Sequence, residues 1–379
     1  MAELGVYVHL PWCVRRCPYC DFNSHELRGA APFADYVEAL LEDLEDDLAL
    51  VAGRAVGSVF FGGGTPSLCP PVLLGQFLDG LAARLPVEGS AEITLEANPG
   101  TVERGQFSDF AAAGVNRISL GVQSFQPRLL QAIGRIHGPR EAHAAIEELH
   151  QAGIDNFNID LMYGLPGQVP AEAEADIAAA LAAAPPHLSL YQLTLEPGTP
   201  FYRRPPELPD EEACEVMEQS AARLLAEAGL RKYEVSAWAR PGSECRHNLN
   251  YWAFGDFLGL GAGAHGKLSL GDGRVVRRRR RRRPLAWLAG PRIEGEETLD
   301  PDRLVFEFML NALRLVDGFD LARFEARTGL DAARALPGLE RGRKLGLLEC
   351  NGARHWRPTP LGARFLNDAQ ALFLPPGGG

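Results

Sequence analysis

The sequence reads Cys13-Val14-Arg15-Arg16-Cys17-Pro18-Tyr19-Cys20 close to its N-terminus. Its cysteines are separated by three and then two residues, so one loop can place three thiolates around one face of an iron–sulfur cubane. A [4Fe–4S] cluster has four irons, and three protein thiolates leave one iron open to a small chelating ligand. The spacing therefore indicates a cluster that binds and cleaves a small molecule rather than one that only carries electrons.

Two other interpretations of these cysteines stay open at this point. Buried cysteines can be plain apolar residues without a chemical role. Cysteines can also belong to a zinc site, which prefers four nitrogen or sulfur ligands, and His9 and His25 are close enough in sequence to join one. A disulfide framework is disfavoured, because the chain has seven cysteines, an odd number, spread thinly over 379 residues. That usage is typical of a reducing compartment.

The composition narrows the class of protein further. The length predicts two domains, or one large and one small, and an apolar content of 46% is ample for a core. A net charge of −11 argues against a general nucleic-acid binder. No stretch approaches the roughly 20 apolar residues of a membrane span. The first residues contain neither a basic region nor a long apolar run, so we expect no signal peptide and a soluble, cytoplasmic protein.

Short apolar runs alternate with helix-like stretches over the first 200 residues. The expected strands are Val6–Leu10, Ser58–Phe61, Glu92–Glu96, Arg117–Gly121, Asn156–Met162 and His187–Thr194. The expected helices are Ala34–Val51, Pro71–Arg84, Glu103–Ala113, Pro139–Ala152 and Ala171–Ala184. This alternation implies parallel strands joined by helical crossovers, in an open sheet or an incomplete barrel. In either architecture, ligands gather at the carboxyl ends of the strands.

The alternation fades after residue 200. A helix over Asp210–Ala228 leads into an expected strand, Lys232–Trp238, and then into the glycine-rich stretch Gly255–Gly266. Residues 300–379 look separate, with helices expected around Asp302–Arg314, Leu321–Thr328 and Leu339–Leu345, a hairpin at Asn351-Gly352, and a last helix over Leu361–Phe373. Helices followed by a hairpin suggest a winged-helix-like unit. None of these helices has a dense basic face, so we expect no nucleic-acid partner.

Polar residues are expected to meet at the carboxyl edge of the predicted sheet. The run Gly62-Gly63-Gly64-Thr65-Pro66 follows the second strand directly, and glycines there let backbone N–H groups approach a ligand closely. It is neither a P-loop nor a GxGxxG motif, and alone it could be an ordinary strand-to-helix turn. Glu96, Gln123 and Asp160 end later strands on the same side. Together with the cysteines, they predict a polar cofactor site.

These motifs resemble those of a known family. The cysteine triplet, the aromatic Tyr19 before its last member and the glycine run are similar to radical S-adenosylmethionine (SAM) enzymes. Five further segments narrow the resemblance to the oxygen-independent coproporphyrinogen III oxidase group: Tyr7–Cys13, Phe61–Pro66, Leu95–Gly100, Gly121–Phe125 and Asp160–Pro166. The resemblance covers residues 5–375. It implies an α/β fold, an incomplete (β/α)6 TIM-like radical SAM barrel with a smaller C-terminal winged-helix-like α+β domain.

Two departures favour one branch of that group. The oxidase has a fourth cysteine two residues after the third, where this sequence has Phe22, and it has a longer N-terminal extension. The segment His247–Trp252 is similar to the heme-binding motif of the radical SAM heme chaperone (HemW) family. We therefore expect a heme chaperone that delivers heme to target hemoproteins such as respiratory enzymes. The alternative is the oxidase, which decarboxylates coproporphyrinogen III by radical chemistry in porphyrin metabolism, so whether the chain is an enzyme stays open.

The resemblance implies a role for each matching position. Cys13, Cys17 and Cys20 would hold the cluster, His247 would ligate heme iron, and Tyr251 and Trp252 would supply aromatic contact. The SAM region would be lined by Tyr7, Tyr19, Gly63, Gly64, Thr65, Glu96, Gln123, Arg135 and Asp160. The expected cofactors are thus a [4Fe–4S] cluster, SAM and heme. The expected domains are the radical SAM barrel at 1–210, an extension and linker at 211–295 with the heme motif, and the C-terminal domain at 296–379.

One stretch departs from this family. Arg277–Arg283 is a run of seven arginines in an acidic chain. Because like charges repel, we expect this run to be exposed or partly disordered. Contact with heme propionates or an anionic membrane surface is the alternative role for it. The expected partners are heme and a heme-accepting protein, and the sequence leaves a homodimer and a peripheral membrane contact open.

Overall fold

The structure is a computed structural model that describes residues 4–51, 53–101 and 106–375. Its strands are β1 (Leu4–Leu10), β2 (Trp12–Cys13), β3 (His25–Glu26), β4 (Val56–Gly63), β5 (Val87–Ala97), β6 (Arg117–Gln123), β7 (Phe157–Tyr163), β8 (His187–Gln192), β9 (Arg231–Glu234), β10 (Ala237–Ala239), β11 (Asp256–Leu260), β12 (His265–Ser269), β13 (Val275–Arg280), β14 (Ile293–Thr298), β15 (Phe319–Asp320), β16 (Leu348–Asn351) and β17 (His355–Pro358).

The α-helices are α1 (Phe33–Val51), α2 (Pro71–Ala82), α3 (Gln106–Ala112), α4 (Pro127–Ala132), α5 (Pro139–Gln151), α6 (Pro170–Ala182), α7 (Pro200–Arg203), α8 (Glu211–Glu227), α9 (Arg246–Trp252), α10 (Pro284–Leu288), α11 (Pro301–Ala312), α12 (Leu321–Thr328), α13 (Leu336–Lys344), α14 (Pro360–Arg364) and α15 (Leu366–Ala371). Short 3₁₀ turns lie at Pro66–Leu68, Pro99–Thr101 and Ala332–Arg334. The first three residues of the expected helix Glu103–Ala113 lie outside the described residues.

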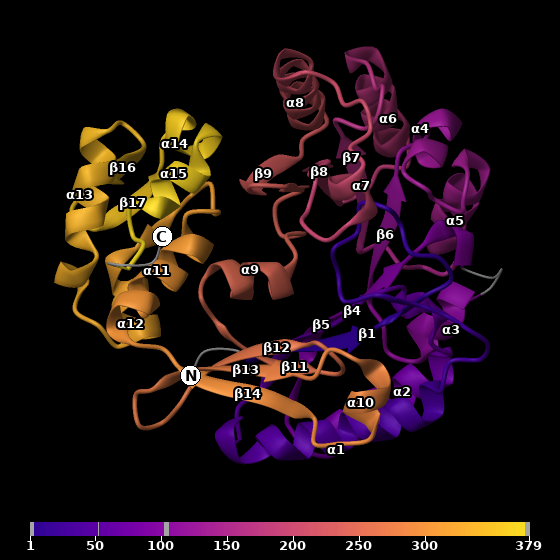
Figure 1. The fold of residues 1–379 in the computed structure, drawn as a ribbon, viewed down its shortest axis with the longest axis horizontal. Coiled ribbons are helices and arrows are strands. Elements are labelled where there is room, and N and C mark those ends of the chain that lie inside the picture. The colour runs from indigo at the N-terminus through magenta and orange to yellow at the C-terminus, as the bar shows by residue number, and fades with distance from the viewer. Residues whose placement is uncertain (1–3, 52, 102–105, 376–379) are drawn as a thin grey trace.

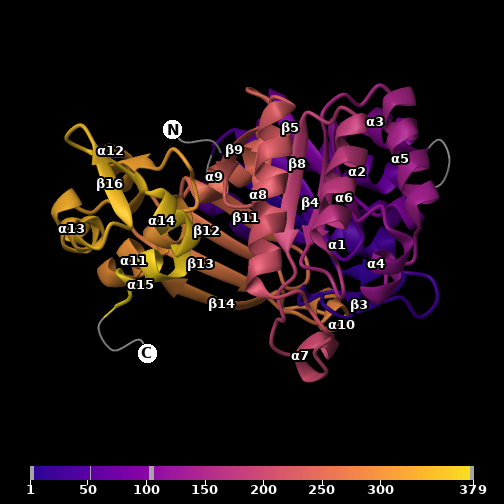
Figure 2. The ribbon, with the colours of Figure 1, turned by 90° about the horizontal axis from the view of Figure 1, so that it is seen from above.

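Six parallel strands form the centre of the main sheet, in the order β1-β4-β5-β6-β7-β8. Helices connect each strand to the next, and Figures 1 and 2 show them along the outer side of the sheet. The predicted strand–helix alternation and incomplete barrel are therefore confirmed. Since parallel strands share one direction, all six carboxyl ends meet at one edge.

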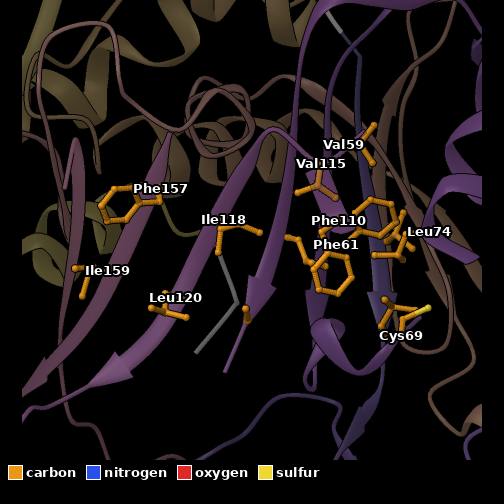
Figure 3. Close-up of a cluster of buried hydrophobic side chains, with 14 of the residues drawn as sticks. Val59, Phe61, Cys69, Leu74, Phe110, Val115, Ile118, Leu120, Phe157 and Ile159 are labelled. Carbon is orange, nitrogen blue, oxygen red and sulfur yellow. The ribbon is translucent and has the colours of Figure 1, made fainter. Parts of the chain in front are cut away.

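The outer face of these strands is apolar because side chains alternate between the two faces of a strand. Val59 and Phe61 on β4, with Ile118 and Leu120 on β6, are buried against Leu74, Phe110 and their neighbours from the helices (Figure 3). Burying apolar surface of this kind is the main stabilising term, at roughly 25 cal/mol per Å².

The inner face of the same strands is polar. Glu92 and Glu96 lie on the same face of β5, because they are an even number of residues apart. Arg117 on β6 and Asp160 on β7 lie on that face as well. A ligand that enters the barrel therefore meets charged and hydrogen-bonding groups, while the helices hold the outside together.

The sheet continues beyond β1 into an extension. Strand β11 pairs with β1 in parallel, and β12, β13 and β14 follow as antiparallel strands. The glycine-rich stretch Gly255–Gly266 therefore contains β11, the turn that follows it and the start of β12. The expected single strand Lys232–Trp238 is instead two antiparallel strands, β9 and β10, at the other edge of the sheet.

The expectation that Arg277–Arg283 is exposed or disordered is wrong for four of its seven arginines, which are buried or half-buried: Arg277, Arg278, Arg280 and Arg281. Its first four arginines belong to β13, and Arg280 is only 1% exposed. The Arg280 guanidinium pairs with Asp43 and Asp47 of α1, at 2.7 Å each, and Arg278 also pairs with Asp47. Because Asp43 and Asp47 are one helical turn apart, α1 presents both carboxylates to the strand and neutralises it.

The last elements form a smaller α+β unit, seen beside the barrel in Figure 1. Its own core contains Phe308, Phe324 and Trp356, and β15, β17 and β16 form a three-stranded sheet. The hairpin predicted at Asn351-Gly352 is confirmed by β16 and β17. The expected last helix is instead two, α14 and α15, because Phe365 leaves the helical conformation, with φ −108° and ψ 50°. None of the helices in the described ranges is both long and apolar enough to cross a bilayer.

Candidate functional site

A cavity of about 350 Å³ lies at the carboxyl edge of the parallel strands. All three cysteines of the N-terminal loop line it. Residues predicted to line the SAM region share this cavity, namely Tyr19, Gly63, Gly64, Thr65, Glu96, Gln123, Arg135 and Asp160. Segments more than 140 residues apart in sequence thus converge on one chamber, at the edge where parallel sheets bind ligands.

Backbone contacts fix the shape of the cysteine loop. The amide of Leu27 donates to the carbonyl of Cys13 at 2.9 Å, and the amide of Phe201 donates to Pro18 at 3.1 Å. The Arg135 guanidinium lies 3.8 Å from the sulfur of Cys17 and donates to the carbonyl of Gly121 at 2.5 Å. The loop is therefore held at its start, Cys13, and in its middle, Cys17 and Pro18, by the protein itself.

The donor set fits an iron–sulfur cluster better than a zinc ion. Both ring nitrogens of His9 are engaged, Nδ1 with the Tyr7 hydroxyl at 2.9 Å and Nε2 with the carbonyl of Asn23 at 3.0 Å, so His9 is not available to a metal. Within the described ranges, no three His, Cys, Asp or Glu side chains converge on a single ion site. A cubane does not need such convergence, because each thiolate binds a different iron. Phe22, at the position of a fourth cysteine, is 60% exposed.

Burial raises the pKa of two thiols in this loop. Burial raises the pKa of Cys13, and a hydrogen bond from Thr65 opposes the rise. Burial also raises the pKa of Cys20, against contacts from Phe22 and Ser24. Both side chains are therefore thiols in the protein as described, and cluster binding would release their protons.

The glycine run lets the end of β4 lie directly against the cysteine loop. Gly63 has φ +124°, and a Cβ there would lie 2.8 Å from the carbonyl oxygen of Leu10. A Cβ on Gly64 would lie 2.6 Å from the carbonyl oxygen of Trp12. The N–H groups of Gly63, Gly64 and Thr65 donate to Glu96, Leu10 and Trp12 at 3.1, 2.8 and 2.8 Å. The glycine pattern predicted that these N–H groups approach a ligand. In the structure they bond to neighbouring protein groups instead and form part of the cavity wall.

Two half-buried carboxyl groups, those of Glu96 and Asp160, line the cavity. Burial raises the pKa of Glu96 to about 8, the nearby Asp160 adds to the rise, and the amide of Gly63 opposes it. Burial also raises the pKa of Asp160, although Asn158 and Ser119 donate to its oxygens at 2.8 and 3.0 Å. A cationic or hydrogen-bond-donating ligand group would relieve this crowding of acids.

Gln123 adopts a strained conformation at the end of β6. Its φ is +69°, in the left-handed region that residues other than glycine rarely adopt, at a cost of about 1–3 kcal/mol. Its side chain lines the cavity. Strain of this kind concentrates at ligand sites.

Two of the predicted residues lie outside this cavity. Tyr7 is half-buried on the inner face of β1, where its hydroxyl contacts His9. His247 lies on α9, which covers the amino end of the barrel, and is only 4% exposed. Its Nδ1 lies 3.0 Å from the Ser58 hydroxyl, its ring stacks on Phe60 at 5.2 Å, and burial lowers its pKa to about 4.

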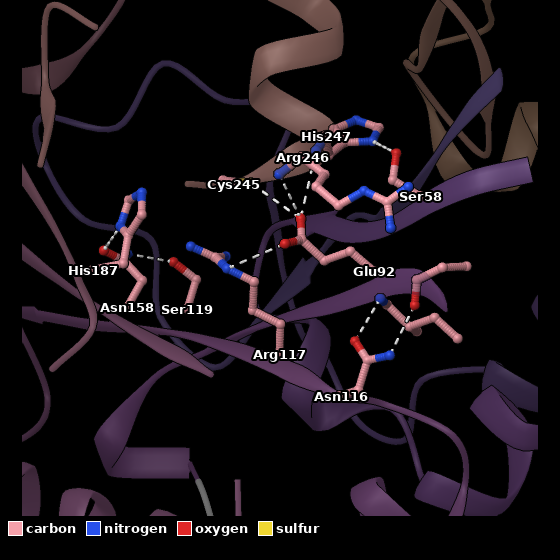
Figure 4. A network of polar contacts seen from close by, with 12 residues as sticks. Ser58, Glu92, Asn116, Arg117, Ser119, Asn158, His187, Cys245, Arg246 and His247 are labelled. Atoms are coloured by element: carbon pink, nitrogen blue, oxygen red, sulfur yellow. Dashed lines mark hydrogen bonds and ion pairs between the residues drawn. The ribbon is translucent and has the colours of Figure 1, made fainter. Parts of the chain in front are cut away.

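A polar network ties α9 to the sheet (Figure 4). Glu92 accepts from the amides of Arg246 and His247 at 2.9 and 3.4 Å and from the Cys245 thiol at 3.5 Å. Its second oxygen lies 3.9 Å from Arg117, which is 2% exposed. Sequence reasoning missed this network, because nothing in the sequence pairs residue 92 with residue 245.

Sequence reasoning also missed residues at the end of β8. Tyr191, Gln192, Thr194 and Glu196 line the cavity together with Met162 of β7. The signal was present, since polar residues end the predicted strand His187–Thr194 just as they end its neighbours.

Comparisons with known proteins agree with this geometry. The Radical SAM superfamily model matches residues 7–180, and the HemN C-terminal domain model matches residues 299–365. Heme chaperone HemW of Escherichia coli (strain K12) is 48% identical over 375 residues, covering 99% of each chain. Heme chaperone HemW of Haemophilus influenzae is 42% identical, covering 99% of this chain and 98% of the relative.

The fold also matches a solved structure. Coproporphyrinogen III oxidase (HemN) from Escherichia coli superposes with a TM-score of 0.82 over 98% of this chain and 90% of its own, at 22% identity. At that identity the likeness shows the fold alone. Barrel, cysteine loop and cavity together define a radical SAM protein. Within that class, the chain belongs to the heme chaperone HemW family.

Proposed function

We propose that this protein binds heme and delivers it to hemoproteins such as respiratory enzymes. The observation that supports this most strongly is the 48% identity to a heme chaperone over 99% of both chains. An exposed Phe22 where the oxidase has a further cysteine agrees with it. The second candidate function is radical decarboxylation of coproporphyrinogen III, because the chain shares the fold of the oxidase.

The cavity is the proposed site of a [4Fe–4S] cluster and SAM. Cys13, Cys17 and Cys20 would hold the cluster through three of its irons. A reduced cluster of this type supplies one electron that can cleave a sulfonium S–C bond. Around it, Glu96 and Asp160 offer acceptors for an ammonium or hydroxyl group, and the Arg135 guanidinium lies 3.8 Å from the sulfur of Cys17.

His247 is the proposed heme ligand from the family motif. In the described conformation its imidazole is enclosed by Ser58, Phe60 and Tyr7, at ring distances of 5.2 and 6.4 Å from the two aromatic rings. A porphyrin reaches that ring only if α9 moves away from β4. The hydrogen bonds that Glu92 accepts from the start of α9 would have to break in that movement.

We assign the parts of the chain as follows. Residues 1–210 form the radical SAM barrel, 211–295 the extension with the heme motif, and 296–379 the C-terminal domain. A cytoplasmic location and a heme-accepting protein partner are further parts of the proposal.

A titration with ferric heme tests the proposed function. Purified wild-type protein should give a Soret band that saturates as heme is added, and His247→Ala should shift that band while the cluster content stays the same. Iron and acid-labile sulfide are measured in both proteins. Identical spectra would make His247 a structural residue, and absence of saturable binding by the wild type would overturn the chaperone function.

A further inference from the structure

A chain of buried hydrogen bonds lies behind the Asp160 carboxyl group, which lines the cavity. Asn158 is two residues earlier on the same face of β7, and its amide nitrogen donates to an Asp160 oxygen at 2.8 Å. Strand pairing places Asn158 between Ser119 of β6 and His187 of β8. Asn158 and His187 are each 1% exposed, so neighbouring protein groups have to satisfy their polar atoms.

Both ends of the Asn158 amide group are engaged. Its nitrogen also donates to the Ser119 hydroxyl at 2.7 Å, and that hydroxyl donates to the second Asp160 oxygen at 3.0 Å. Its carbonyl oxygen lies 2.7 Å from Nδ1 of His187 and accepts from the Ser189 hydroxyl at 3.1 Å. Figure 4 shows the contacts from His187 to Asn158 and on to Ser119. Asp160 therefore accepts two hydrogen bonds whose donors are held by the strands on either side.

The chain of hydrogen bonds runs in one direction, toward the cavity. A carbonyl oxygen only accepts, so Nδ1 of His187 has to carry the proton that bonds to Asn158. Burial lowers the pKa of His187, and in a neutral ring Nε2 is then an acceptor for the Tyr233 hydroxyl, 2.8 Å away. The Tyr233 oxygen accepts from the amide of Cys245 at 3.3 Å, just before α9. Each member thus donates to the next, and the last acceptor is Asp160.

The two acids of the cavity differ in this support. Glu96 accepts from the amide of Gly63 at 3.1 Å, whereas Asp160 accepts from two side chains. Hydrogen bonds donated to a carboxylate favour its charged form, so Asp160 is the better place for the negative charge of this crowded pair. A protonated Glu96 agrees with the pKa of about 8 for that group.

Asp160 has acceptor capacity left for a ligand. A carboxylate can accept about four hydrogen bonds, and Asn158 and Ser119 supply two. Asp160 is half-buried and lines the cavity, so a ligand there can reach its oxygens. Hydrogen bonds weaken steeply when they are misaligned, so a carboxylate held by fixed donors binds an ammonium or hydroxyl group better than one that rotates.

We propose that His187 and Asn158 are positioning residues that hold Asp160 as the charged hydrogen-bond acceptor of the cavity. The inference rests on the proposed function, because it takes SAM as the ligand that supplies the ammonium or hydroxyl donor. Neither residue lines the cavity. His187 acts through Asn158, since its Nδ1–H group holds the Asn158 carbonyl oxygen and so keeps the amide nitrogen turned toward Asp160.

Equilibrium binding of SAM to the anaerobically reconstituted protein tests this role. His187→Leu removes the donor to Asn158 and should weaken SAM binding about tenfold, with iron and sulfide content unchanged. His187→Asn restores an N–H donor close to the position of Nδ1, so its affinity should stay within about threefold of the wild type. Thr328→Val is the control, because it removes a buried hydrogen bond of 2.7 Å, to Phe324 in the C-terminal unit, and should bind SAM as the wild type does.

The protonation of the ring is a second readout, and it needs no cofactor. Heteronuclear NMR of protein with isotope-labelled histidine should show His187 as a neutral ring with its proton on Nδ1 at neutral pH. The signal is assigned by its absence from His187→Asn. A charged ring, or a proton on Nε2, would reverse the direction of the chain and overturn the inference.

The outcomes separate the inference from the proposed function. If the wild type binds SAM and His187→Leu binds it equally well, only this inference fails. Equal losses in His187→Leu and His187→Asn, or an equal loss in Thr328→Val, would overturn it as well. If the reconstituted wild type holds a cluster but binds no SAM, the proposed cofactor site fails and the inference with it. Circular dichroism checks that each variant folds, and if His187→Leu does not, the position of the ring proton decides.

Discussion

The two ends of the barrel are built differently although the same strands supply both. At the carboxyl end, an open cavity of about 350 Å³ holds three thiols, two crowded carboxyl groups and a strained Gln123. At the amino end, α9 covers the strands, and Glu92 accepts hydrogen bonds from its first two residues and from Cys245 just before it. The comparison shows two uses of polar residues: at the closed end Glu92 ties α9 to the sheet, whereas at the open end Glu96, Gln123 and Asp160 face a cavity.

The largest expected effect comes from the open end. Cys13→Ala, Cys17→Ala or Cys20→Ala should abolish the [4Fe–4S] cluster, because each removes one of only three thiolates available to it. Iron and sulfide are measured after anaerobic reconstitution, with Cys350→Ala as the control. Cys350 is remote, on β16. A triple variant that still retained four irons per chain would contradict the assignment.

The closed end should show a loss of stability instead. Glu92→Ala leaves Arg117 buried without its partner, so the free energy of unfolding should fall by about 3–5 kcal/mol. Urea unfolding measures this loss. The residual folded protein should still accept a cluster, since Glu92 does not line the cavity. If Glu92→Ala lost the cluster but kept its stability, the closed end would affect cluster binding at the open end, which contradicts this account.

A glycine at the border of the open cavity should have a somewhat smaller effect. Gly63→Ala places a Cβ 2.8 Å from the Leu10 carbonyl oxygen in a positive-φ conformation, so stability should fall by about 2–4 kcal/mol. Gly89→Ala is the matched control, because a Cβ there meets nothing within 4 Å. Equal unfolding curves for Gly63→Ala and Gly89→Ala would show that a Cβ at position 63 causes no steric clash.

The smallest expected effect is a pH dependence of stability that comes from Glu96 at the open end. Glu96 has a pKa of about 8 in the folded protein, above its ordinary value of 4.5, so the folded state holds a proton that the unfolded state has lost. Stability should therefore fall as pH rises from 6 to 8, by roughly 2 kcal/mol from this group. Glu96→Gln should remove that part of the slope. An unchanged slope in the variant would mean that Glu96 is ionised in the folded protein.

The sequence predicted the parts of the molecule that local patterns encode. Strand–helix alternation predicted the parallel sheet, and spacing predicted that Cys13, Cys17 and Cys20 share a loop. Strand ends predicted that Glu96, Gln123 and Asp160 meet. These features depend on periodicity and on the direction of parallel strands, which are legible in one sequence.

The errors concern contacts between distant segments. The run Arg277–Arg283 looked like a solvated charge cluster, and only α1, more than 230 residues earlier, shows that Asp43 and Asp47 neutralise Arg280. The surroundings of His247 have no local signal either, because its burial depends on Ser58 and Phe60, which lie far away in the sequence. Long-range pairing of this kind has no local signal.

One experiment tests the account's central claim most directly. Anaerobically reconstituted protein is loaded with ferric heme and mixed with a heme-free hemoprotein, while a parallel sample receives coproporphyrinogen III, SAM and a reductant. The account predicts that heme leaves this protein and that the acceptor gains its spectrum and activity, with no protoporphyrinogen IX formed. Formation of protoporphyrinogen IX together with a failure to bind or transfer heme would contradict it.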